Sequence, residues 1–200
     1  MIYWIGGGSG AGKSTVARRL AAEYGWAVYH TDDVMPEHAR RSTPREAPYL
    51  HAFMAMTMDE RWVDRSPETM LETFHWFRGE AFDLILDDLR KLPGDRPVVA
   101  EGFRLLPHLV GPERAVWLLP TPAFRRQALE SRGSLWSIAG RTSNPERALA
   151  NLLERDRLFT DRLRQETARR GLPVVEIEVG MSQDEVAERA VAAMRPAARP

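Results

Sequence analysis

A glycine-rich stretch close to the N-terminus constrains the fold of this chain more than any other feature of the sequence. Residues 7–14 read GGSGAGKS, which fits the pattern G-x-x-x-x-G-K-[ST] at every position, and Thr15 follows. The apolar run Ile2–Ile5 precedes the motif and predicts a buried strand. Apolar residues then recur at helical spacing, which predicts a helix from about Gly12 to Tyr24. The motif thus predicts a strand, a loop and a helix in direct succession.

This arrangement suits the binding of phosphate. Glycines allow the backbone to curl so that successive N–H groups point at an anion, and the following helix adds its positive N-terminal end. We expect Lys13 to reach the β- and γ-phosphates of a nucleotide and the Ser14 hydroxyl to ligate Mg²⁺. The alternative is a glycine-rich turn without a ligand, but one of only two lysines in the chain occupies the required position. The predicted nucleotide-binding residues are Gly7, Gly8, Ser9, Gly10, Ala11, Gly12, Lys13, Ser14 and Thr15.

The rest of the chain alternates between predicted strands and helices. Further strands are predicted at Ala27–Tyr29, Pro97–Ala100, Ala115–Leu119 and Pro173–Val179. Helices are predicted over residues 66–91, 122–131 and 144–171 and from residue 182 onward, with short helices and loops at 34–66 and a loop at 133–144. Strands that alternate with helices predict a five-stranded parallel sheet covered on both faces, in a single domain spanning residues 1–200.

Composition excludes several other classes of protein. The formal net charge is +0, so we expect neither a nucleic-acid partner nor a membrane surface. Cysteine is absent, which excludes disulfides and thiolate metal sites. No apolar run approaches the ~20 residues of a spanning helix, and the N-terminus lacks a signal-peptide layout. We therefore expect a soluble cytoplasmic protein, either a monomer or a homodimer.

Other motifs narrow the class of phosphate-loop (P-loop, or Walker A) protein. The chain has no N-K-x-D guanine motif and no L-S-G-G-Q-like signature, and its third strand ends in Glu101 rather than in the Asp of a Walker B strand. It resembles the nucleoside and nucleotide kinase group, which includes gluconate, shikimate, uridine and adenylate kinases. The residues that carry the resemblance are the P-loop, Asp32-Asp33, Val98–Gly102 and the arginine-bearing segment from Arg132 to Arg155. The resemblance implies a three-layer α/β/α P-loop NTPase fold, with ATP and Mg²⁺ as cofactors.

The resemblance also implies roles for acids at two strand ends. Asp32 or Asp33 is expected to be the general base or to orient the acceptor hydroxyl, with Asp32 favoured and also contacting the metal through water. Glu101 is expected to bind the substrate or a metal-bound water, because ligands of open α/β sheets bind at the carboxyl ends of strands. The alternative is that these acids only cap turns. Arg104 either grips an anionic acceptor or is solvated.

A lid and an acceptor-binding insertion complete the expected site. By resemblance, residues 133–146 form the lid, with Arg132 near the adenine and Arg141 and Arg155 at the phosphates. Residues 34–82 are expected to enclose the acceptor, where Arg78 offers positive charge. Their aromatic residues favour a core position over a pocket by ordinary burial preferences. These aromatic residues are Phe53, Trp62, Phe74, Trp76 and Phe77. His75 lacks a spacing partner for a metal site and is expected to be hydrogen-bonded or exposed.

The sequence therefore predicts a Mg²⁺- and ATP-dependent phosphotransferase that acts on a small-molecule acceptor. The acceptor is either a hydroxyl compound or a nucleoside monophosphate. Two alternatives stay open: an ATP-binding regulatory protein that does not transfer phosphate, and an NTPase without an acceptor.

Overall fold

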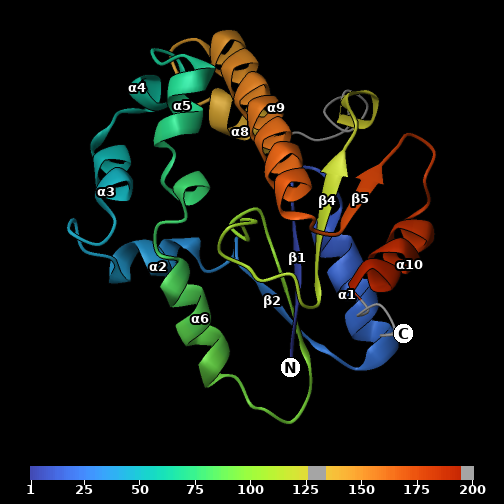
Figure 1. Cartoon of the computed structure of the whole chain (residues 1–200). Helices are drawn as coiled ribbons and strands as arrows, with labels where there is room; N and C mark the ends of the chain where they lie inside the picture. The colour runs from blue at the N-terminus through green and yellow to red at the C-terminus, as the bar shows by residue number, and fades with distance from the viewer. Residues whose placement is uncertain (126–133, 195–200) are drawn as a thin grey trace.

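A five-stranded parallel sheet lies at the centre of the computed structural model, which describes residues 1–125 and 134–194 (Figure 1). Its strands run in the order β2-β3-β1-β4-β5. They are β1 (Ile2–Gly7), β2 (Ala27–His30), β3 (Val98–Glu101), β4 (Ala115–Pro120) and β5 (Val174–Ile177). The predicted parallel sheet and its five strands are confirmed, because each observed strand overlaps its predicted range.

Helices cover both faces of the sheet and complete the three-layer α/β/α architecture (Figure 1). Helices α1 and α10 pack on one face, and α6 and α9 pack on the other. The helices are α1 (Lys13–Tyr24), α2 (Met35–Arg41), α3 (Pro48–Ala55), α4 (Met58–Trp62), α5 (Pro67–Thr73), the 3-10 helix η1 (His75–Arg78), α6 (Phe82–Lys91), α8 (Ser134–Ala139), α9 (Pro145–Arg170) and α10 (Gln183–Met194).

Strand β4 shows why its sequence is an unbroken apolar run. All six of its residues are buried. Val116 and Leu118 pack in the cluster that α1 and α10 form, whereas Trp117 and Leu119 pack in the cluster of α6 and α9. A strand buried on both faces needs apolar side chains at every position, so it lacks the alternation of a half-exposed strand.

The strand order places a crevice beside the P-loop. The chain leaves β1 toward β2 and β3 on one side and reaches β4 and β5 on the other. Ligands of open α/β sheets bind where the strand order reverses, outside the carboxyl ends of the strands. Gly7 ends β1 at this point, and His30 pairs with Glu101 in register at the ends of β2 and β3.

The prediction of one helix over residues 66–91 is wrong. The segment divides into α5, η1 and α6. Phe74 is extended, and Gly79 and Ala81 have positive φ values of 82° and 59°, so the backbone cannot continue as a right-handed helix. A Cβ on Gly79 would also come within 2.6 Å of Leu109. Trp76 and Phe77 lie in η1, between the two helices, and both are buried.

The structure also corrects one prediction for the second half of the chain. Residues 133–144, predicted as a loop, contain helix α8. The helix predicted over 122–131 is helical at 122–125, and the rest lies outside the described residues. The long helix after Asn144 is confirmed as α9, with the Asn144 side chain accepting from the amide of Arg147 and Gly171 ending it in a left-handed conformation.

The insertion between β2 and β3 packs against the segment expected to form the lid. Trp62 and Met70 of the insertion share a cluster with Ala139 of α8 and Leu152 of α9. Figure 1 shows α4, α5, α8 and the first half of α9 gathered at one end of the molecule. Among the described residues, no helix is long and apolar enough to cross a membrane.

Candidate active site

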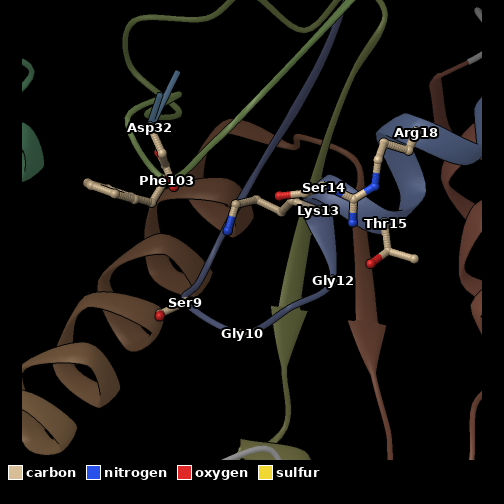
Figure 2. A pocket seen from close by; sticks show the side chains of 9 residues that line it. All are labelled: Ser9, Gly10, Gly12, Lys13, Ser14, Thr15, Arg18, Asp32 and Phe103. Carbon is tan, nitrogen blue, oxygen red and sulfur yellow. The ribbon is translucent and has the colours of Figure 1, made fainter. Parts of the chain in front are cut away.

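The P-loop lines a cavity of about 360 Å³ at the start of α1 (Figure 2). Gly10 and Gly12 have positive φ values of 77° and 80°, and a Cβ at either position would meet no atom within 4 Å. These two glycines are therefore required by the backbone conformation and not by packing. The cavity is lined by Ser9, Gly10, Gly12, Lys13, Ser14, Thr15, Arg18, Asp32 and Phe103.

The backbone of this loop fits an anionic ligand. Within residues 1–125 and 134–194, the amides of Gly10, Gly12 and Ser14 donate no hydrogen bond to another protein group. Lys13 is only 8% exposed, and its Nζ donates to the Gly8 carbonyl at 2.9 Å across the loop. Amides without acceptors, beside an ammonium group and a helix N-terminus, match the needs of a nucleotide's phosphates. Because the Ser14 hydroxyl and the Asp32 carboxylate line the same cavity, the oxygen ligands that Mg²⁺ prefers are also present.

Of the two adjacent acids, only Asp32 lines the P-loop cavity. It follows β2, accepts a hydrogen bond from Thr31 Oγ1 at 3.2 Å and lies opposite Lys13 (Figure 2). Burial raises the pKa of Asp32, and the Glu101 carboxylate adds to the rise, whereas Lys13 opposes it. Asp33 is exposed and does not line the cavity. The geometry thus separates two acids that the sequence left as alternatives.

Glu101 lies at the end of the neighbouring strand β3 and is buried. It is 2% exposed, its Oε1 lies 2.6 Å from His30 Nδ1, and its Oε2 has no hydrogen-bond partner among the described residues. It does not line the P-loop cavity. The next residue, Gly102, has a φ of 150°, and a Cβ there would lie 1.7 Å from Thr31 Oγ1. The backbone at the end of β3 therefore approaches the segment that carries Asp32.

Arg104 is neither solvated nor available to grip an acceptor, which corrects both expectations for it. Its guanidinium is buried and donates to the carbonyls of Thr31 and Ala81, at 3.2 Å each. It also lies 3.0 Å from His38 Nδ1 and stacks over the Trp76 ring. Burial lowers the pKa of Arg104 to about 10. Its side chain holds the backbone beside Asp32 against the insertion.

A second cavity, of about 260 Å³, lies beside the first and has mainly aromatic and aliphatic walls. The two cavities share Ser9 and Phe103 in their linings. The second cavity is lined by Ser9, Met35, Phe53, Trp62, Phe74, His75, Trp76, Phe77, Phe103, Leu135, Ile138, Arg155, Asp156 and Phe159. The five aromatic residues that burial preferences placed in the core therefore line a cavity, while three of them, Trp62, Trp76 and Phe77, are also buried.

The predicted arginines take different positions. Arg155 lines the second cavity and not the P-loop cavity. Arg78 is exposed, stacks over the Tyr49 ring at 4.1 Å and lines neither cavity. Arg141 is also exposed and lines neither. Arg132 lies outside the described residues.

Sequence reasoning missed other residues of the two cavities. Phe103 links them, and its position two residues after the end of β3 was the available signal. Arg18 lies one turn after Ser14 on α1, a spacing that places both side chains on one face.

His75 is buried rather than exposed, and its Nδ1 has no hydrogen-bond partner among the described residues, which corrects the expectation of a hydrogen-bonded or exposed histidine. Burial, together with nearby arginines, lowers its pKa to about 3, so the ring is neutral at physiological pH.

The sheet order, the flanking helices and the glycine loop between β1 and α1 define a three-layer α/β/α protein with the P-loop NTPase fold. No protein-family model matches the chain, and no curated protein sequence is similar to it. Among solved structures, deoxyadenosine kinase from M. mycoides with dCMP and dCDP has a TM-score of 0.50 at 12% identity, covering 96% of this chain and 97% of that one. The same kinase with dATP gives a TM-score of 0.48 at 12% identity over 96% and 98% of the chains, and thymidylate kinase from Candida albicans gives 0.49 at 12% over 96% and 89%. At this identity the likeness concerns the fold.

Proposed function

We propose that this protein is an ATP- and Mg²⁺-dependent phosphotransferase that moves the γ-phosphoryl group to a small-molecule acceptor. One observation carries the proposal. The P-loop cavity shares Ser9 and Phe103 with the second cavity, called the aromatic cavity from here on, and Asp32 lines the P-loop cavity. A nucleotide in the first cavity and an acceptor in the second would meet at this junction. Hydrolysis needs only a water molecule as the nucleophile, so a second, mainly apolar cavity beside the phosphates favours transfer to an acceptor over hydrolysis.

The proposed chemistry assigns a separate task to each group. The loop amides and Lys13 hold the β- and γ-phosphates. Ser14 and Asp32 are the residues that would hold Mg²⁺, and the bound ion would supply positive charge that neutralises the phosphates. The acceptor oxygen attacks the γ-phosphorus, and the bond from that phosphorus to the β–γ bridging oxygen breaks, with its electron pair leaving on ADP. The hydroxyl proton passes to the Asp32 carboxylate.

Removing the carboxylate of Asp32 should abolish transfer and leave ATP binding nearly intact. Asp32→Asn keeps the size of the side chain but not its charge, so we expect a loss of about 10²–10⁴-fold in kcat, the usual range for a general base. Asp33→Asn is the matched control, because Asp33 is adjacent and exposed, and it should retain wild-type kcat. Acceptor-dependent ADP release and ATP titration calorimetry are the measurements. Equal activity of both variants would remove the general-base assignment.

The same assay separates the proposed function from its alternatives. ADP release that rises with an added acceptor, together with a phosphorylated product in the mass spectrum, supports transfer. ADP release that no acceptor stimulates would identify an NTPase. Tight ATP binding without turnover in any condition would identify a regulatory ATP-binding protein.

A further inference from the structure

The aromatic cavity is lined by two side chains, Arg155 and His75, that each have one buried polar atom without a partner among residues 1–125 and 134–194. Arg155 is 7% exposed, and its Nη1 donates no hydrogen bond to the described residues. His75 is 2% exposed, and its Nδ1 is likewise without a partner among them. Buried polar atoms are almost always hydrogen-bonded, so two such atoms in the lining of one cavity point to a ligand that completes them.

The charges of this cavity cancel. Arg155 donates through both Nε and Nη2 to Asp156 Oδ1, at 3.0 and 2.7 Å, and Asp156 is itself buried. His75 is neutral, since burial lowers its pKa to about 3. Among the described residues that line the P-loop cavity, the cationic side chains are Lys13 and Arg18, both beside the loop expected to hold ATP. A phosphate or a carboxylate on the acceptor would therefore lose its hydration without gaining a cation of its own, which disfavours an anionic acceptor.

The walls favour flat rings. Arg155 lies 5.3, 5.0 and 5.3 Å from the ring centroids of Trp62, Phe74 and Phe77. Phe53 adds an edge-on ring to Trp62 and Phe74. Aromatic faces and a planar guanidinium stack on planar groups, whereas a polyol buried here would lose water without enough hydrogen-bond partners. The volume of about 260 Å³ lies below the ~300–1,000 Å³ of ordinary ligand pockets, so the occupant is small.

Taken together with the proposed function, on which it rests, we infer that the acceptor is an uncharged hydroxyl compound built on a planar heteroaromatic ring. The ring lies in the aromatic cavity, and the hydroxyl group extends past Ser9 and Phe103 toward Asp32. Arg155 Nη1 donates to an acceptor atom on the ring edge, and His75 Nδ1 bonds a second edge atom. This selects the hydroxyl compound over the nucleoside monophosphate among the two acceptor types that the sequence left open.

Equilibrium binding to the full chain tests this inference apart from catalysis. The probes are uridine, adenosine and pyridoxine, compared with uridine and adenosine 5′-monophosphates and with gluconate and shikimate. Titrations are carried out with a non-hydrolysable ATP analogue bound and followed by calorimetry and by intrinsic tryptophan fluorescence, to which Trp62 and Trp76 of the cavity wall contribute. We expect at least one heteroaromatic alcohol to bind at least tenfold more tightly than either nucleoside monophosphate and than gluconate or shikimate.

Failure of this inference and failure of the proposed function give different results. If the ATP analogue binds and gluconate, shikimate or a monophosphate is the preferred ligand and acceptor, the inference is overturned while phosphotransfer stands. If no heteroaromatic probe binds under these conditions, the inference is also overturned. If the ATP analogue itself does not bind, this result overturns the proposed function, and the inference that rests on it is overturned as well.

Two variants locate the binding within the cavity. Phe53→Leu, at a half-buried position, should weaken the binding of a heteroaromatic probe at least fivefold, whereas Tyr24→Leu, which replaces an exposed ring on α1, should not change the affinity.

Arg155→Lys keeps the positive charge but removes the planar guanidinium group. It should therefore reduce the preference for pyridoxine over benzyl alcohol, which has no ring heteroatom, while Arg162→Lys on the same helix preserves that preference. A purely structural Arg155 would weaken both ligands equally, and this result would overturn its assigned contact.

Discussion

Asp32 and Asp33 show that a shift of one position along the chain decides whether a carboxylate lines the P-loop cavity. They are chemically identical neighbours, yet only Asp32 lines the P-loop cavity, and burial raises its pKa. Glu101 contributes to this rise because its carboxylate is buried nearby. A carboxylate whose pKa is raised is a stronger base when ionised, but it is protonated at a higher pH.

Glu101→Gln should therefore move the acidic limb of the pH–rate profile to lower pH. The substitution removes a negative charge that raises the pKa of Asp32, so Asp32 stays ionised further into the acidic range. The measurement is kcat/KM against pH with the best acceptor. Glu23→Gln, an exposed acid on α1, should leave the limb in place. A limb that stays fixed or moves upward in Glu101→Gln would contradict the coupling.

At the scale of elements, one polar network ties the insertion to the sheet. Asp88 of α6 receives hydrogen bonds from Tyr29 of β2 at 3.0 Å and from Arg41 of α2 at 2.7 Å. His38 Nε2 lies 2.7 Å from the same carboxylate, and its Nδ1 faces Arg104. Because arginine only donates, His38 Nδ1 must accept, and Nε2 therefore carries the proton that Asp88 accepts.

Asp88→Asn should destabilise the protein by about 2–4 kcal/mol, since it breaks a partly buried charged network. Burial alone would raise the pKa of Asp88, but hydrogen bonds from His38, Arg41 and Tyr29 lower it to about 2. Its contribution is thus present above the unfolded pKa of about 3.9 and is lost as the pH falls toward 2. Urea unfolding between pH 7 and pH 3 should show a smaller loss of stability in the variant. Asp87→Asn, at a half-exposed neighbouring position, should stay within about 0.5 kcal/mol of wild type.

The break between η1 and α6 gives two substitutions of opposite sign. Ala81 has a φ of 59°, so Ala81→Gly should stabilise the fold by about 0.5–1 kcal/mol by relieving a left-handed conformation. Gly79→Ala should destabilise it by more than about 1 kcal/mol, because it adds strain and a clash with Leu109. Denaturant midpoints at constant slope measure both effects. Changes of the same sign in the two variants would contradict the assigned backbone conformation.

At the scale of the whole molecule, ligand binding should be visible as stability. ATP at a hundredfold excess over its Kd should add about 2.7 kcal/mol to the free energy of unfolding. Lys13→Ala should lose most of this gain in a thermal-shift assay. Lys91→Ala is the matched control, since it removes the other lysine of the chain from an exposed position on α6 and should keep the full shift. A shift that survives in Lys13→Ala would place the nucleotide elsewhere.

Sequence reasoning predicted the parts of the fold that depend on local patterns. The P-loop, the buried strands and α9 are specified by glycine spacing, apolar runs and caps close in sequence. The break at residues 74–81 was missed because Ala81 gives no local signal for a positive φ. The aromatic residues of the insertion were predicted to favour the core over a pocket, because spacing within one helix does not distinguish a cavity wall from a core. The walls of the cavity also include residues from α8 and α9, which are distant in sequence.

Gly102 has a consequence for any survey of mutational tolerance. A methyl group at this position would overlap Thr31 Oγ1 and push on the turn that carries Asp32. A saturation library should therefore show Gly102 to be as intolerant as Lys13, although it lines neither cavity. In such a map, the most sensitive positions would include residues that keep two chain segments close together. High sensitivity to mutation would therefore not by itself identify a residue that contacts a ligand.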